Sequence, residues 1–266
     1  MTSKINVLLM GTIGSGKTRS LRTIPPTGKT LLCLATEPGI ESILGAGSRE
    51  GDLHGPHCHW NEVLPASVPF NNLIDNADLA NRLDQKALAA RPRLNAADYR
   101  QFITFLNFCT NFRCKVCGQE FGPVDRLGPE FVFAIDGITG LSQMAMDLVA
   151  GGRPLRDKPH YGLAQDNLMN FIRKAVYDTR CSVVMIAHLD RRVNELTGAS
   201  HLTVSAIGQA IGMEIPKPFD EVVQAVRVGK DFYWSTTEVN TELKARRLAF
   251  ADNLTPDFAP LLREEG

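Results

Sequence analysis

Short apolar runs alternate with polar and glycine-rich stretches along the chain. Four of these runs are almost wholly apolar and predict buried strands over residues 5–10, 30–35, 131–135 and 183–187. Strands that are apolar on both faces are typical of parallel sheets covered by helices. A glycine-rich turn and a predicted helix start at residues 17–22 separate the first two runs, which makes a strand–loop–helix–strand unit. The pattern therefore predicts an α/β fold with a mostly parallel sheet flanked by helices.

The pattern loosens between residues 45 and 128. Residues 45–69 are rich in glycine, proline and histidine and predict an irregular excursion. Helical spacing of apolar residues returns over 77–90 and 96–109. We expect a single domain over residues 1–266, with 45–128 as an insertion within it.

Regular alternation resumes in the second half of the chain. An apolar stripe predicts a helix over residues 163–178. Two short runs at 222–228 and 231–236 predict an antiparallel hairpin around Gly229. The polar, glycine-rich stretch from 191 to 218 is too long for a simple connection, so we expect it to have a function.

Composition and charge limit the classes of protein. Apolar residues make up 44% of the chain and charged residues 22%, as in ordinary globular proteins. Lys plus Arg equals Asp plus Glu at 29 each, so any basic binding surface must be local. No apolar run approaches the roughly 20 residues that span a bilayer, and the polar start shows no signal peptide. We expect a cytoplasmic protein with no membrane partner.

A glycine-rich turn follows the first predicted strand and precedes the first predicted helix. It has the phosphate-loop spacing G-x4-G-K-T, and its residues are Gly11, Thr12, Ile13, Gly14, Ser15, Gly16, Lys17 and Thr18. Glycines let backbone N–H groups turn towards phosphate oxygens, and the helix start adds a favourable dipole. Lys17 offers a charge to the β- and γ-phosphates, and Thr18 offers a hydroxyl to Mg²⁺. The segment predicts ATP and Mg²⁺ binding; the alternative is a turn that matches the spacing by chance.

Three further polar residues lie at the ends of predicted strands. Asp136 ends the third strand and is a second candidate ligand for Mg²⁺, Glu37 follows the second strand, and His188 follows the fourth. The carboxyl ends of parallel strands share one edge of the sheet, where ligands bind. Glu37 is a candidate base for the attacking water, and His188 a candidate sensor of the γ-phosphate. The alternatives are a turn-capping aspartate, a solvent-facing glutamate and a structural histidine.

Two cysteines at close spacing, Cys114 and Cys117, predict a zinc knuckle. A chain without a visible secretion signal favours reduced thiols or zinc over disulfides. A zinc site needs two more ligands. We favour Cys58 together with His59 or His57, and Cys109 is a further candidate. The alternative is a pair of reduced surface cysteines without a metal.

The order of these elements resembles the core of RecA-type recombinases. The likeness is greatest to the phage-encoded, single-domain RecA-like ATPases of single-strand annealing and recombination. The segments that carry it are residues 11–18, 34–37, 131–141, 161–176 and 183–192, together with Lys244-Ala245-Arg246 and Asp257-Phe258-Ala259-Pro260-Leu261. Residues 45–128 lie outside the resemblance. It implies a RecA-like P-loop ATPase core, located in the bacterial host cell if phage-encoded.

The resemblance also implies roles for particular residues. Glu37 would be the catalytic carboxylate, Asp136 the acid on the magnesium side, and His188 the sensor that couples the γ-phosphate to DNA. Residues 151–161 and 191–217 would be two DNA-binding loops. They contain Arg153, Arg156, Lys158, His160, Arg191 and Arg192, which the alternative treats as ordinary solvated charges. Lys244 and Arg246 would reach a neighbouring subunit's phosphates as arginine fingers do.

The function implied is a DNA-stimulated ATPase with single-stranded DNA, other copies of the chain and a single-strand DNA-binding protein as partners. Two departures from full-length recombinases are visible. We expect the large N-terminal oligomerisation segment to be missing, because the first predicted strand begins at Ile5, and simple recombinase cores lack the cysteine-containing insertion. Two other functions stay open. One is a P-loop kinase for a small molecule, with Arg191 and Arg192 as its lid, and the other is a non-hydrolysing, ATP-gated module that loads a partner onto DNA.

Overall fold

A single large sheet forms the centre of the computed structural model, which describes residues 4–43, 54–90, 96–151, 153, 155–193, 198, 200–208, 210–238 and 240–263. The strand order is β10-β9-β1-β7-β6-β2-β3, and β8 pairs with the end of β7. The strands are β1 (Asn6–Gly11), β2 (Thr30–Ala35), β3 (Cys58–Glu62), β6 (Phe131–Asp136), β7 (Ser182–Val193), β8 (Ser200–Val204), β9 (Glu221–Val228) and β10 (Asp231–Ser235). All neighbours pair in parallel except β10 with β9 and β8 with β7.

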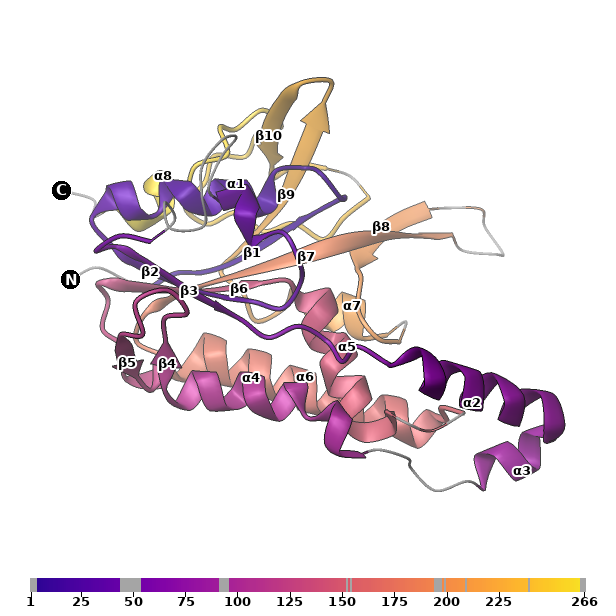
Figure 1. Ribbon diagram of the computed structural model, residues 1–266. Helices are drawn as coiled ribbons and strands as arrows, with labels where there is room; N and C mark the ends of the chain where they lie inside the picture. The colour runs from indigo at the N-terminus through magenta and orange to yellow at the C-terminus, as the bar shows by residue number, and fades with distance from the viewer. Residues whose placement is uncertain are drawn as a thin grey trace.

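Helices cover both faces of this sheet, as Figure 1 shows. On one face lie α4 (Gln101–Thr110), α5 (Ile138–Ala150) and α6 (Lys158–Asp178), which share a core with side chains of β1, β2, β6 and β7. On the other face lie α1 (Lys17–Ser20) and α8 (Ala259–Leu262), next to a second core. Because β1, β2 and β6 contribute alternate residues to the two cores, their runs are apolar throughout, as the sequence predicts.

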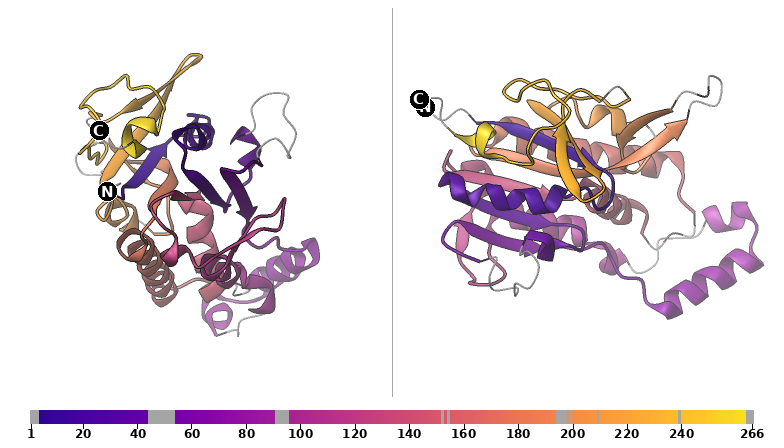
Figure 2. Two further views of the ribbon diagram at one scale, coloured as in Figure 1. Left: turned by 90° about the vertical axis from the view of Figure 1, so that its left-hand side faces the viewer. Right: turned by 90° about the horizontal axis from the view of Figure 1, so that it is seen from above.

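The parallel register brings the carboxyl ends of the central strands to one edge of the sheet. Gly11 at the end of β1 pairs with His188 in β7, and Asp136 at the end of β6 pairs with Ala35 and Ile186. The two ends of the described chain lie together on one side of the molecule in both views of Figure 2. The predicted hairpin is confirmed as β9 and β10.

Residues 45–69, expected to be an irregular excursion, contain a strand of the main sheet. β3 pairs in parallel with β2 along its whole length, with Leu31 opposite Cys58 and Ala35 opposite Glu62. The sequence of β3 is mostly polar, although Trp60 within it is buried. Because β3 is an edge strand, its other residues need not be apolar. Farther along, α4 places Phe102 and Phe105 in the main core. The segment 45–128 therefore supplies an edge strand and a core helix.

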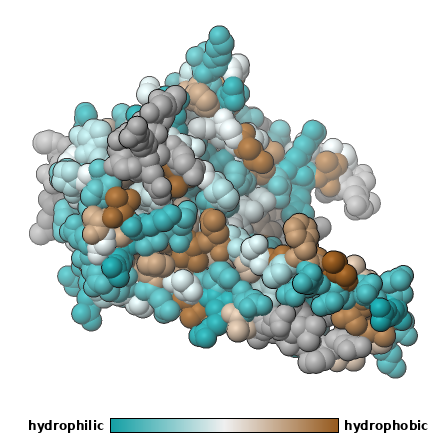
Figure 3. All heavy atoms as spheres, in the orientation of Figure 1, coloured by the Kyte–Doolittle hydropathy of each residue, from teal (hydrophilic) through white to brown (hydrophobic). Residues whose placement is uncertain are grey.

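A helical arm, made of α2 (Phe70–Arg82) and α3 (Gln85–Ala89), projects from the body (Figures 1 and 2). The helical spacing expected over 77–90 is thus divided between two helices, of which the first begins at Phe70. No residue of α2 is buried. Phe70, Leu73 and Ile74 are exposed, and Figure 3 shows apolar atoms along this arm. No helix in the described residues is long and apolar enough to cross a membrane.

Candidate nucleotide site

The phosphate loop wraps around the carboxyl end of β1. Gly14 and Gly16 have φ angles of 76° and 84°, a left-handed conformation that side chains with a Cβ rarely adopt. Gly11 is required for a different reason: a Cβ there would lie 2.5 Å from Ser15 Oγ and 2.6 Å from the carbonyl oxygen of Ala225. Helix α1 begins directly at Lys17. The backbone thus has the tight turn that the spacing of glycines predicts.

Lys17 is folded back over this loop. Its Nζ donates to the carbonyl oxygens of Gly11 at 2.9 Å and Thr12 at 2.8 Å, and only 5% of the residue is exposed. Burial lowers the pKa of Lys17 to about 8, although Asp136 and Glu37 act in the opposite direction. An ammonium group in this environment gains strongly from a phosphate, because the added anion compensates for the lost hydration.

Asp136 lies beside the first turn of α1 and is 6% exposed. Burial raises its pKa to about 6, and a hydrogen bond from the Thr18 hydroxyl works against that rise. A carboxylate and a hydroxyl that touch each other next to a phosphate loop are the donor set expected for Mg²⁺. The residues present therefore fit the ion that the motif implies, and Thr18 and Asp136 would be its protein ligands.

Glu37 and His188 contact each other across the edge of the sheet. Nε2 of His188 lies 2.9 Å from Oε2 of Glu37, and the backbone N–H of Gly140 donates to Oε1 at 2.8 Å. Burial alone would raise the pKa of Glu37, but the hydrogen bonds from His188 and Gly140 outweigh it and the pKa is lowered. Nδ1 of His188 lies 3.3 Å from Nζ of Lys17. His188 therefore joins the carboxylate to the phosphate-loop lysine.

Two glycines that sequence reasoning missed make room for Glu37. A Cβ at Gly137 would lie 2.5 Å from Oε1 of Glu37, and a Cβ at Gly140 would lie 2.2 Å from the carbonyl oxygen of Thr36. The Thr36 hydroxyl also hydrogen-bonds the backbone of Gly137, which fixes the turn before Glu37. A glycine directly after a strand-ending aspartate, with a second three residues later, is the signal that was available in the sequence.

A cavity of about 760 Å³ opens above these groups. Its lining includes the phosphate loop, Glu37, Asp136, His188 and Phe232 of β10. Phe232, which the sequence did not single out, packs against the loop, since a Cβ on Gly16 would lie 2.9 Å from its ring. The guanidinium of Arg227 lies 5.5 Å from the ring centroid. The volume and the polar end of this cavity suit a nucleotide.

Lys244 and Arg246 lie away from this cavity, beside the amino end of β9. Lys244 pairs with Val222, and its Nζ donates to the carbonyl oxygen of Phe219 at 2.6 Å. Arg246 forms an ion pair of 2.9 Å with Asp220, while 63% of its side chain stays exposed. Neither residue reaches the phosphate loop of its own chain. Their expected contact with a neighbouring subunit's phosphates therefore requires a second subunit and stays a prediction.

The two segments expected to be DNA loops are more regular than predicted. Residues 158–161 already belong to α6, which begins after the capping residue Asp157. Residues 191–217 begin as the end of β7, which forms an antiparallel hairpin with β8 and projects from the sheet in Figure 1. Residues 152, 154, 194–197, 199 and 209 lie outside the described part of these segments. DNA binding by either segment stays a prediction.

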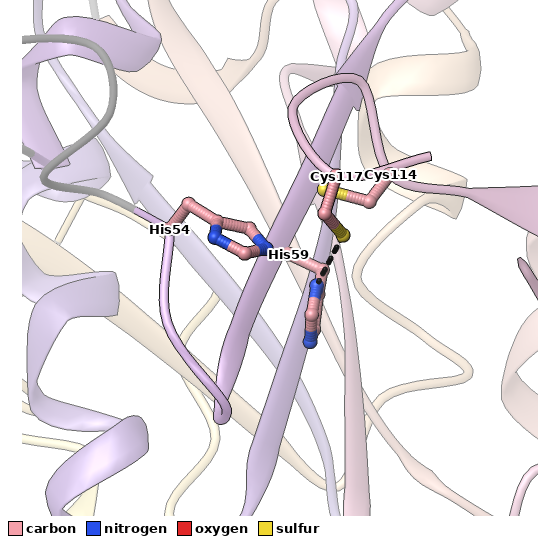
Figure 4. A group of neighbouring side chains, drawn as sticks. All are labelled: His54, His59, Cys114 and Cys117. Atoms are coloured by element: carbon pink, nitrogen blue, oxygen red, sulfur yellow. Dashed lines mark hydrogen bonds between the residues drawn. The ribbon is translucent and has the colours of Figure 1, made fainter. Parts of the chain in front are cut away.

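The Cys114–Cys117 turn meets two histidines, as Figure 4 shows. His54 and His59 complete the group of four, whereas Cys58, the expected ligand, is not part of it. Neighbouring residues of a strand point to opposite faces. Cys58 accordingly packs against the core that contains Leu31, while His59 faces the turn. Burial alone would raise the pKa of Cys114, but backbone N–H groups of Cys117, Trp60 and Val116 lower it.

The phosphate loop, the magnesium-side acid and the parallel sheet flanked by helices define a P-loop NTPase. Comparison with known families agrees, since the profile of the AAA_24 family, described as an AAA domain, matches residues 3–247. The chain belongs to this family of P-loop ATPase domains, for which nucleotide binding and hydrolysis are the general activity. No curated protein matches the chain.

Replacing Asp136 distinguishes its effect on the stability of the nucleotide-free protein from its effect on the binding of Mg²⁺ and ATP. We expect Asp136→Asn to raise the melting temperature of the nucleotide-free protein at neutral pH by about 2 °C or more, because an unliganded buried carboxylate costs desolvation energy. The same change should remove most of the stabilisation that Mg²⁺ and ATP provide, since a neutral amide is a weaker magnesium ligand. Thermal unfolding with and without Mg²⁺–ATP measures both effects.

The exposed residue Asp166 in α6 offers the matched control, and Asp166→Asn should change neither quantity. A nucleotide-free Asp136→Asn protein that melts lower than the wild type would show that the carboxylate stabilises the fold.

Proposed function

We propose that this chain is a Mg²⁺-dependent ATPase that acts on single-stranded DNA, as the resemblance to phage recombination ATPases implies. The hydrolytic step is assigned to the residues of the cavity. Glu37, whose pKa is lowered, would orient a water molecule and accept its proton. Lys17 would exchange its contacts with Gly11 and Thr12 for phosphate oxygens. Thr18 and Asp136 would hold Mg²⁺, whose positive charge would offset the negative charge of the nucleotide's phosphates.

One observation supports the link to DNA: a single strand carries both His188 and the candidate DNA-binding arginines. β7 runs without a break from Ser182 to Val193, so Arg191 follows His188 on the same strand, with Leu189 and Asp190 between them. The end of β8, the other strand of the hairpin, is also connected to His188. The N–H of Ser205, directly after β8, donates to the carbonyl oxygen of His188 at 2.8 Å. Movement of His188 on nucleotide binding would therefore be transmitted to the hairpin.

A small-molecule kinase is the other enzyme class that a phosphate loop allows. In that case Arg191 and Arg192 would have to close over the cavity as a lid. Neither arginine lines the cavity, and Nη2 of Arg191 lies 3.3 Å from Ser200 Oγ on the neighbouring strand of the hairpin. This placement favours a role outside the nucleotide site, as the DNA-binding proposal requires. A loading module without turnover would keep the same contacts, so hydrolysis has to be measured.

The first test compares ATP hydrolysis with single-stranded DNA, with nucleosides and with neither. We expect single-stranded DNA to stimulate the rate of ATP hydrolysis and nucleosides to leave it unchanged. Lys17→Ala should lower it by roughly 10² or more, because the lost charge stabilises the transition state most. Lys174→Ala, an exposed lysine of α6, is the control and should retain the wild-type rate. Stimulation by a nucleoside would support the kinase, and bound ATP without turnover would support the loading module.

The second test addresses the hairpin. Arg191→Ala should raise the DNA concentration needed for half-maximal stimulation, and should reduce the slope of log affinity against log salt by about 0.7, as one lost phosphate contact predicts. Arg180→Ala is the matched control, because Arg180 is exposed just before β7, at the opposite end of this strand. Binding measured by fluorescence anisotropy at several salt concentrations gives the slope. Equal effects of the two substitutions would argue against the hairpin as the DNA contact.

The third test concerns Arg246 and assembly. If Arg246 completes a neighbour's site, specific activity should rise with protein concentration, and Arg246→Ala should bind ATP but hydrolyse it slowly. Mixing Arg246→Ala with Lys17→Ala should restore part of the activity, since one interface in the mixture combines an intact loop with an intact arginine. Activity that is independent of concentration, with no recovery in the mixture, would show that each chain holds a complete site and that Arg246 serves its ion pair with Asp220.

A further inference from the structure

Four side chains from two separate segments converge beside the edge of the sheet (Figure 4). His54 precedes β3 and His59 lies within it, while Cys114 and Cys117 lie on the turn between two short strands, β4 (Phe112–Arg113) and β5 (Glu120–Gly122). One ligand atom from each residue lies within 4.8 Å of the other three. Sγ of Cys117 and Nδ1 of His59 are 3.7 Å apart.

These separations are close to those of a zinc centre. Zn–S bonds of about 2.3 Å and Zn–N bonds of about 2.0–2.1 Å, at tetrahedral angles, place neighbouring ligand atoms about 3.3–3.8 Å apart. The distance between Cys117 and His59 already falls in this range. Small side-chain rotations would bring the remaining atoms to it. Two thiolates with two imidazoles are also a donor set that zinc prefers and that Mg²⁺ and Ca²⁺ do not.

A second observation at this site comes from His54. Its Nε2 is buried and has no hydrogen-bond partner among the residues that the structure describes. A buried polar atom without a partner costs free energy, so it usually indicates a ligand or an ion. The sulfur of Cys114, by contrast, accepts hydrogen bonds from backbone N–H groups of Trp60, Val116 and Cys117. Such bonds orient a metal-binding thiolate from outside the coordination shell.

We propose that His54, His59, Cys114 and Cys117 bind one zinc ion that fastens the cysteine turn to strand β3. Four protein ligands close a tetrahedral shell and leave no position for a substrate or for water, so the ion is structural. The site is separate from the ATP cavity, whose lining contains none of these residues. The proposal therefore does not depend on the function assigned to the nucleotide site.

The contacts around the four residues show what the ion would hold together. The N–H of Lys115 donates to the carbonyl oxygen of Trp60 at 2.8 Å, and Nδ2 of Asn61 donates to the carbonyl oxygen of Arg113 at 2.7 Å. Nζ of Lys115 also pairs with Glu62 at 2.8 Å. The turn thus covers the outer edge of β3, the end of the main sheet. A covered edge cannot pair with another chain, which removes a route to aggregation.

Metal analysis of the full chain, purified without chelator, tests the proposal. The wild type should contain about one zinc per chain. His59→Ala and Cys114→Ser should each reduce this to below about 0.2 per chain. His57→Ala and Cys58→Ser are the matched controls, because each removes the same type of side chain from the same strand region without touching the group of four. Both controls should retain zinc.

Cobalt substitution tests the site in the wild type, so its result does not depend on whether the variants fold. Replacing zinc by Co²⁺ should give the intense visible absorption of a tetrahedral site and a thiolate-to-metal band, and adding zinc should remove both. Chelation should lower the melting temperature and expose residues 54–128 to protease first. A wild type that takes up neither zinc nor Co²⁺ would overturn the proposal. Loss of zinc in Cys58→Ser equal to that in Cys114→Ser would also overturn this set of ligands.

Discussion

The parallel register of the central strands is the constraint on which the nucleotide site depends. Because Gly11 lies opposite His188 and Asp136 lies opposite Ala35, β1, β2 and β6 end at one edge of the sheet, beside His188 of β7. The loop after β1 and the turn after β2 are therefore held beside Asp136. A shift of one strand by a single residue would turn its side chains to the other face and separate these groups.

Burial gives the site its chemical character. Lys17 and Asp136 are both removed from water, so the pKa of the lysine is lowered and that of the aspartate is raised. Each charge is incompletely compensated by the protein alone, and a nucleotide with its metal ion would supply what is missing. Glu37 differs, because His188 and the N–H of Gly140 favour its ionised form. Two carboxylates close together are thus prepared for different tasks by their surroundings.

The segment between β2 and β6 extends the sheet and covers one of its edges. β3 extends the sheet by one strand, α4 fills the core below it, and the cysteine turn covers the new edge. The exposed helix α2 then departs from the body at the far end of this strand. Neither β3, α4 nor the cysteine turn lines the nucleotide cavity, whose residues from this segment lie directly after β2.

The sequence by itself determined the α/β class, the phosphate loop and the positions of Asp136, Glu37 and His188 in the chain. These features are local, since glycine spacing, apolar runs and the residue that ends a strand are all visible within a few positions. Tertiary structure alone decided the pairing of His188 with Glu37 and the need for Gly137 and Gly140. It also placed His54 and His59, and not Cys58, beside the cysteine pair, because Cys58 lies on the face of β3 opposite to His59. Contacts between segments far apart in sequence arise from packing, and β3, with one buried tryptophan among polar residues, left no pattern from which they could be predicted.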